Sequence, residues 1–204
     1  MKKIILLILT VIFTFGTVGC ATNKETTNNA AKEAFSSFLS GGTTLLGAQV
    51  EEMGIPDFND NILKYEYTYL DVNADGVVEM LVQLQDDPCG YNAVFHFDGK
   101  QIICWQSDSV EGSCRDYPLK DGTMVQQYDY SGTRGYTLFR YNSKGEKVDI
   151  SDMFARDELI YSDDASKCPY YEFDGAEVSK DEFDKKYKLL IEESMLKRDA
   201  WKAI

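Results

Sequence analysis

The spacing of hydrophobic residues separates a strand-rich middle of the chain from helical ends. From residue 65 onward, apolar side chains recur at every second position, which is the pattern of a strand with one buried face. Met80, Val82 and Leu84, for example, share one face of a single segment. The pattern predicts strands at residues 65–69, 80–85, 91–97, 101–106, 123–130, 135–141, 146–150, 157–161 and 170–173.

Short turns join these segments, and Asp-Gly pairs favour hairpins between antiparallel strands. Such pairs occur at residues 98–99, 121–122 and 174–175, and Ser-Lys-Gly at 143–145 joins two further strands. Consecutive short strands joined in this way form an antiparallel meander. We therefore expect a sheet of short strands built from hairpins like those of a propeller blade.

Helical spacing marks the two ends of this meander. Residues 30–39 and 43–53 read as helices, and Gly41-Gly42 separates them. Near the carboxyl end, Ser179 and Glu182 form a capping box, and apolar residues follow it at helical intervals. The predicted fold class is therefore α+β, with an N-terminal helical region and a C-terminal helix packed on the sheet.

The first residues resemble a signal for export. Lys2 and Lys3 precede an apolar run at residues 4–18, which is short for a membrane span and typical of a signal peptide. Cys20 follows small residues, as in a bacterial lipobox. We expect residues 1–19 to be a lipoprotein signal peptide, 20–29 a flexible tether and 30–204 a single domain, with lipid on Cys20 holding the protein at the outer face of the cytoplasmic membrane. The alternatives are an ordinary secretory signal with Cys20 incidental, or an uncleaved anchor.

The charge of the chain argues against nucleic acid as a partner. The formal net charge is −13, and it becomes −15 without residues 1–19, which carry two lysines and no acid. A chain this acidic repels phosphate backbones.

Beyond Cys20, the four remaining cysteines are an even number in an exported domain, which suggests disulfides. We expect a bond between Cys89 and Cys114 or between Cys104 and Cys114, and four reduced thiols are the alternative. Cys168 completes the set. The spacing of these residues matches no zinc pattern.

Residues 71–79 carry the clearest chemical motif. Side-chain oxygens recur at positions 1, 3, 5 and 9 of this loop, and Gly76 stands at position 6, where the chain must turn. Ca²⁺ takes oxygen ligands from closely spaced Asp and Asn side chains. Position 12 is Val82 rather than the chelating Glu of an EF-hand, and the flanks read as strands. The loop therefore predicts a calcium site between two strands, with ligands from Asp71, Asn73, Asp75, the carbonyl of Val77, and Glu79.

This loop resembles the D-x-D-x-D-G-x-x-[DE] calcium loop of FG-GAP and VCBS-type repeats, found in integrin-like propellers and many bacterial surface proteins. Residues 67–82, together with the closing phrase at 171–183, resemble small uncharacterised lipoproteins of low-GC Gram-positive bacteria. Two features depart from the repeats: Asn73 replaces an Asp, and a single loop is present. The resemblance implies a calcium-binding lipoprotein of the cell surface and does not imply a full propeller.

No residue pattern specifies a reaction. His96 is the single histidine, and its place in a strand favours a structural role over catalysis. Trp105 is the side chain we expect to be most exposed if the aromatic residues form a sugar-stacking platform. The leading hypothesis is a non-catalytic binding module for an unknown protein or glycan ligand. The alternatives are a hydrolase that acts on envelope glycan through carboxylates, and an accessory subunit that docks on another envelope protein.

Overall fold

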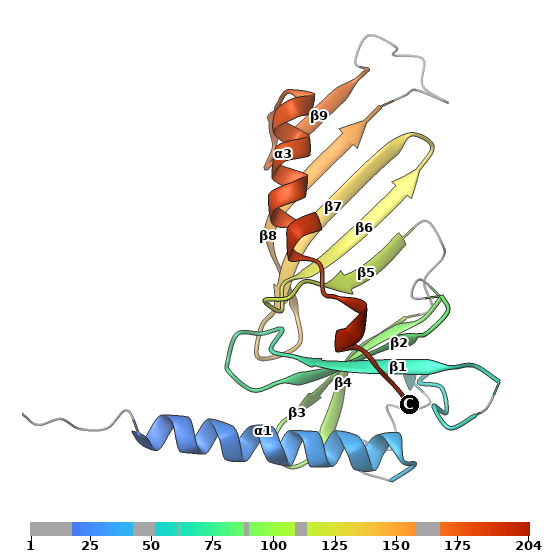
Figure 1. Cartoon of the computed structure of the whole chain (residues 1–204), viewed down its shortest axis with the longest axis vertical. Helices are drawn as coiled ribbons and strands as arrows, with labels where there is room; N and C mark the ends of the chain where they lie inside the picture. The colour runs from blue at the N-terminus through green and yellow to red at the C-terminus, as the bar shows by residue number, and fades with distance from the viewer. Residues whose placement is uncertain (1–17, 43–51, 61, 88–89, 109–113, 158–167) are drawn as a thin grey trace, which may run out of the picture.

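Two antiparallel sheets, each with a helix against one face, make up the part of the chain described by the computed structural model (Figure 1). The described residues are 18–42, 52–60, 62–87, 90–108, 114–157 and 168–204. Sheet A has the order β11 (Lys202–Ala203), β1 (Tyr65–Leu70), β2 (Glu79–Leu84), β3 (Asn92–Phe97) and β4 (Ile102–Asp108). Sheet B has the order β10 (Ala176–Glu177), β9 (Tyr170–Phe173), β8 (Lys147–Arg156), β7 (Thr133–Tyr141), β6 (Met124–Tyr130) and β5 (Cys114–Pro118).

The predicted α+β class and antiparallel meander are confirmed, but the meander is divided between two sheets. Consecutive strands pair in register from β1 to β4 and again from β5 to β10. Three strands were not predicted: β5, β10 and β11. Strand β8 continues to Arg156, beyond its predicted end at residue 150. The predicted strand at 157–161 and the predicted helix at 43–53 fall largely outside the described residues.

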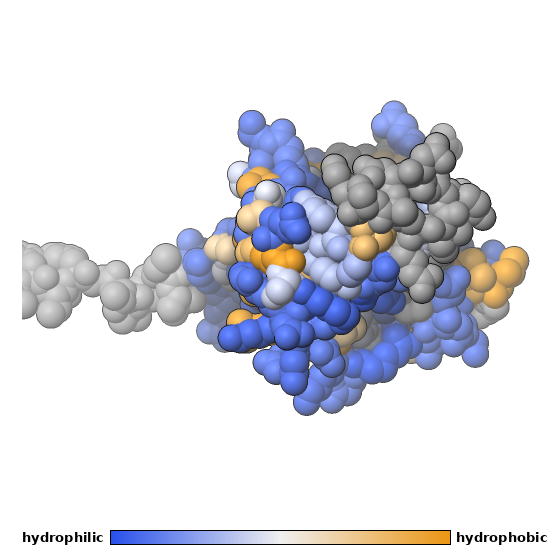
Figure 2. All heavy atoms as spheres, turned by 90° about the horizontal axis from the view of Figure 1, so that it is seen from above, coloured by the Kyte–Doolittle hydropathy of each residue, from blue (hydrophilic) through white to orange (hydrophobic). Residues whose placement is uncertain are grey.

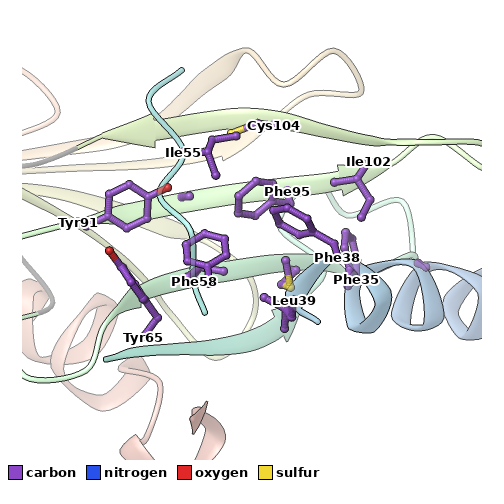
Figure 3. Close-up of a cluster of buried hydrophobic side chains, with 14 residues drawn as sticks. Phe35, Phe38, Leu39, Ile55, Phe58, Tyr65, Tyr91, Phe95, Ile102 and Cys104 are labelled. Atoms are coloured by element: carbon purple, nitrogen blue, oxygen red, sulfur yellow. The ribbon is translucent and has the colours of Figure 1, made fainter. Parts of the chain in front are cut away.

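Helix α1 (Val18–Leu39) packs on one face of sheet A. Its residues Ala31, Phe35 and Phe38 are buried against strands β1 to β4, and the rings of Phe38 and Phe95 lie 5.1 Å apart (Figure 3). The same face collects the alternating residues Met80 and Val82, as the two-residue period predicts. Burial of these aromatic side chains supplies most of the energy that holds α1 on the sheet.

The structure differs from the expected flexible tether at residues 20–29, because these residues are the first turns of α1. Within this segment, Lys24 and Asn28 contact the backbone of the loop at residues 71–79, and hydrophobic spacing cannot predict such a polar contact. Among the described residues, no helix is long and apolar enough to cross a membrane.

Helix α3 (Lys180–Leu190) covers one face of sheet B, as predicted for the C-terminal helix. The Ser179 hydroxyl accepts a hydrogen bond from the backbone N–H of Glu182 at 3.2 Å, which confirms the predicted N-cap. Phe183 is buried against Tyr171, with ring centroids 5.5 Å apart. After α3 and two short 3₁₀ helices, η2 (Glu192–Ser194) and η3 (Arg198–Ala200), the chain runs back to sheet A, where β11 pairs with β1 (Figure 1).

A third hydrophobic cluster joins the two sheets. It takes Leu81 and Val94 from the face of sheet A opposite α1, and Met124 and Phe139 from one end of sheet B. Val72, from the loop between β1 and β2, is fully buried in this cluster. The loop that the sequence singled out therefore lies where the two sheets meet.

Candidate functional site

The loop at residues 71–79 is closed by hydrogen bonds from its own backbone amides. Asp71 accepts from the N–H groups of Asp75 (3.1 Å) and Gly76 (2.8 Å), and Asp75 accepts from that of Val77 (2.7 Å). The side-chain oxygen of Asn73 also accepts from the N–H of Asp75 at 2.9 Å. Gly76 has a φ of +88°, so the position that was expected to turn sharply does so.

Helix α1 and sheet B both contact this loop, which itself joins two strands of sheet A. From α1, the ammonium group of Lys24 donates to the Asp75 carbonyl at 2.6 Å, and Asn28 bonds both Gly76 and Val78. From sheet B, the N–H of Tyr141 donates to the Val72 carbonyl at 3.2 Å. The loop therefore connects α1, sheet A and sheet B.

Glu79 is the one acid of the loop that is fully buried. Its carboxylate accepts from the N–H of Val72 at 3.0 Å and lies 2.9 Å from Nδ1 of His96. Burial raises the pKa of Glu79, and the contacts with His96 and the Val72 amide oppose that rise only in part. The His96 ring stacks on Trp105 with centroids 4.4 Å apart. His96 thus has satisfied partners within the fold, in agreement with the structural role favoured from the sequence.

In this structure the loop is arranged around its own hydrogen bonds and not around a cation. Asn73 directs its donor nitrogen at Asp75 (3.0 Å) and Glu79 (3.3 Å), where a ligand to a cation must be an oxygen. No group of three or more acidic, histidine or cysteine side chains that could hold a metal occurs among the described residues. Calcium binding stays a prediction, and it requires Asn73 to turn its amide oxygen toward the two carboxylates.

The predicted cysteine sites are spread through the fold. Cys20 lies within α1, and Cys89 lies outside the described residues. The expected bond between Cys89 and Cys114 is not formed in this structure, because Cys114 is a free thiol. Cys104 and Cys114 are not bonded to each other, because Cys114 is an exposed free thiol at the start of β5. Cys104 is buried, and burial raises the pKa of its thiol to about 12. Cys168 is half-buried and is also a free thiol.

A pocket of about 220 Å³ lies in the corner between the two sheets and the C-terminal segment. The sequence pattern did not predict it, because its lining comes from segments far apart in the chain. Strand β2, strand β5 and the segment around η3 all contribute to it. The lining residues are Gln83, Arg115, Asp116, Tyr117, Pro118, Met195, Leu196, Arg198 and Trp201.

Arg115 is the pocket cation without a carboxylate partner among the described side chains. Its guanidinium donates twice to the side-chain oxygen of Gln127, at 2.9 and 3.1 Å, and lies 5.1 Å from the centre of the Tyr117 ring. These contacts hold the group in one orientation, and no carboxylate among the described side chains pairs with its positive charge. The second guanidinium, that of Arg198, is paired with the buried carboxylate of Glu66.

Asp116, the acid among the described lining residues, is paired with a cation. Its carboxylate accepts from the ammonium group of Lys147 at 2.8 Å and from the side-chain amide of Gln106 at 3.0 Å. Behind it, a small cavity of about 10 Å³ shares Asp116 and Trp201 with the pocket. Asn92 lines this inner cavity, and its buried Nδ2 has no hydrogen-bond partner among the described residues.

Trp105, the residue that would be most exposed in a sugar-stacking platform, is held within the fold, which is the packing role that aromatic residues of strands usually have. His96 covers one side of it, and a Cβ on Gly145 would lie 2.3 Å from its ring. Among the described residues, the exposed aromatic side chains are Tyr128 and Tyr130, both on β6 of sheet B.

Comparisons of this sequence and structure with protein families, with characterised proteins and with solved structures found no match. The geometry of the molecule is therefore the basis for the function proposed below.

Proposed function

We propose that this protein is a non-catalytic binding module whose ligand occupies the pocket between its two sheets. The observation that carries this proposal is the oriented guanidinium of Arg115, which pairs with no carboxylate of the described residues and lies beside a lining that includes Tyr117 and Trp201. In a chain with a formal net charge of −13, a local positive site is unusual and favours an anionic group.

The chemistry of the lining defines the ligand. A guanidinium in a fixed orientation binds a carboxylate through two parallel hydrogen bonds. Met195, Leu196 and Trp201 offer apolar contact a short distance away. A volume of about 220 Å³ lies below the range of about 300–1,000 Å³ usual for drug-sized ligands. The ligand is therefore a small carboxylate with an apolar side, of the size of one capped amino acid.

A carboxylate-dependent hydrolase receives no support from the described residues. Such an enzyme needs two acids in one cleft, one of them with a raised pKa. The pocket contains one acid, Asp116, which is paired with Lys147. The carboxyl group with a raised pKa, that of Glu79, is enclosed in the loop instead.

We further propose that the module is exported and held at the outer face of the membrane by lipid on Cys20. Lys2, Lys3 and the apolar run that follows support this location. Mass spectrometry of the protein isolated from bacterial membranes tests it: the expected product begins at an acylated Cys20, and Cys20→Ala should leave the protein without lipid. A product that begins elsewhere, or carries no lipid, would contradict the location and leave the pocket proposal unaffected.

Isothermal titration with N-acetyl-phenylalanine and its amide tests the pocket. The two compounds differ in the carboxylate alone, so the acid should bind at least about tenfold more tightly, which corresponds to about 1.4 kcal/mol. Arg115→Gln should abolish that difference. Lys188→Gln, which removes one exposed positive charge from α3, should keep it. Equal binding of the two compounds, or a preference that survives in Arg115→Gln, would refute the proposal.

A further inference from the structure

One face of sheet B carries aromatic side chains that neither helix nor the inter-sheet core covers. The side chains of β6 to β9 alternate, so Tyr136, Met153 and Tyr171 face α3, and the residues between them face the other way. Near sheet A, this second face is covered by the inter-sheet cluster. Farther along, the same face carries Tyr128, Tyr130, Phe154 and Tyr170, which we call the aromatic face.

The register of the strands brings these rings close together. Tyr128, Gly135 and Phe154 lie side by side on β6, β7 and β8. A Cβ on Gly135 would lie 1.9 Å from a ring carbon of Tyr128, so the Tyr128 ring rests over the glycine. Phe154 and Tyr170 follow with ring centroids 6.0 Å apart. Gly135 thus allows one ring to lie against the backbone, and Tyr128 remains 36% exposed there.

Polar groups are interleaved with the rings on the aromatic face. By the alternation of β8 and β9, Asp152, Arg156 and Glu172 lie on the same face of sheet B as these rings. The guanidinium of Arg156 lies 5.4 Å from the centre of the Phe154 ring, and the Tyr170 hydroxyl donates to Glu172 at 2.5 Å. Donors and acceptors of both signs therefore border the exposed ring faces.

We propose that the aromatic face binds a neutral oligosaccharide. The C–H faces of a pyranose ring are apolar and pack on aromatic ring faces, while its hydroxyl groups bond with carboxylates and guanidinium groups at the ring edges. One positive and two negative side chains around the rings suit an uncharged ligand with many hydroxyl groups. The glycan site is separate from the pocket, which takes its lining from other segments.

Other partners fit this face less well. An apolar protein surface needs a contiguous hydrophobic patch of several hundred Å². Charged side chains interrupt the aromatic face, so it offers no such patch. The end of the molecule at which α3 and β9 lie is likewise mostly hydrophilic, with small separate hydrophobic patches among the described residues (Figure 2). A nucleic acid would meet Asp152 and Glu172, which repel phosphate.

Isothermal titration of the full exported chain with cellotetraose, chitotetraose and maltotetraose tests this proposal. At least one of these should bind saturably. Tyr128→Ala and Phe154→Ala should each weaken that binding by about tenfold or more. Tyr130→Ala should weaken it without affecting folding, because Tyr130 is 70% exposed. Val148→Ala, at a half-exposed position of β8 near the opposite end of the strand, is the matched control and should bind as the wild type does.

Absence of binding by all three tetrasaccharides at millimolar concentration would overturn the proposal. So would binding that all three aromatic substitutions leave unchanged. Either result is independent of the titration of the pocket with N-acetyl-phenylalanine, because none of the substituted residues lines that pocket.

Discussion

Replacing Glu79 should destabilise the fold more than replacing any exposed acid. Its side chain is fully buried and accepts hydrogen bonds from the N–H of Val72, which is itself fully buried. In Glu79→Ala, that amide loses its acceptor, at about 1–3 kcal/mol, and His96 loses its partner. Removing one member of a buried pair costs about 3–5 kcal/mol. We therefore expect Glu79→Ala to lower the free energy of unfolding by about 3–5 kcal/mol.

Glu79→Gln separates the contribution of the negative charge to stability from that of the hydrogen bonds. A glutamine of similar shape keeps an acceptor for Val72, so the loss should be about 1 kcal/mol. Equilibrium unfolding in urea measures both variants, with Glu193→Ala, at an exposed position, expected within about 0.5 kcal/mol of the wild type. A loss below about 1 kcal/mol for Glu79→Ala would refute the structural role of the buried carboxylate.

The pH dependence of the same comparison has a defined sign. Because the folded protein raises the pKa of Glu79, the folded state binds this proton more tightly than the unfolded state does. The contribution of Glu79 is thus fully present below its unfolded pKa, near 4.5, and is lost as the pH rises through the folded pKa. The stability of the wild type relative to Glu79→Gln should therefore fall as the pH rises above 4.5. A difference that rises with pH would contradict this.

Three further predictions concern Gly122 beside the loop, the carboxyl group of Asp157, and the predicted calcium site. Gly122→Ala should lower the free energy of unfolding in urea by about 3 kcal/mol, because φ is +85° and the new Cβ would lie 2.0 Å from the Asp71 carbonyl oxygen. Gly99→Ala, at φ +91° with open space around it, should lower it by only about 1–2 kcal/mol. Equal losses in the two variants would contradict the close approach at Gly122. Burial alone would raise the pKa of Asp157, but hydrogen bonds from Tyr171 and Arg134 hold it below its ordinary value. The stabilisation that Asp157 contributes should therefore be lost as the pH falls through that lowered pKa. At neutral pH, Asp157→Asn should lack this stabilisation. Melting curves in EDTA and in millimolar Ca²⁺ test the predicted calcium loop: a rise in melting temperature that disappears in Asp71→Ala/Asp75→Ala would establish the site, and coincident curves would show that the loop is only a turn.

Much of the fold could be predicted because its signals are local. Alternation identified most strands, and Met80 and Val82 face α1 as their spacing requires. Ser179 caps α3 as its motif predicts. The division into two sheets could not be predicted, because it depends on which neighbouring strands pair, and the pattern of a single strand does not contain that information. The very short strands β10 and β11 carry no periodic signal at all.

The candidate sites were harder to predict from the sequence than the fold was. The Asp71–Glu79 loop was recognised as a special segment, but its oxygens are directed at its own amides, and the partner of Glu79, His96, is seventeen residues away. The pocket brings Arg115 next to Trp201 through the return of the C-terminal segment to sheet A. The aromatic face needs the register of β6, β7 and β8, because a single strand does not show which rings become neighbours.

The two tryptophans provide the most direct test of the proposed ligand pocket. Trp201 lines the pocket, whereas Trp105 lies under His96 outside the lining. In the ¹⁵N–¹H NMR spectrum of the labelled protein, N-acetyl-phenylalanine should shift the indole N–H signal of Trp201 in a saturable manner and leave that of Trp105 in place. The amide of the same compound should have little effect on either signal. A spectrum in which Trp201 does not move, or in which both signals move equally with both compounds, would contradict a carboxylate-binding pocket between the sheets.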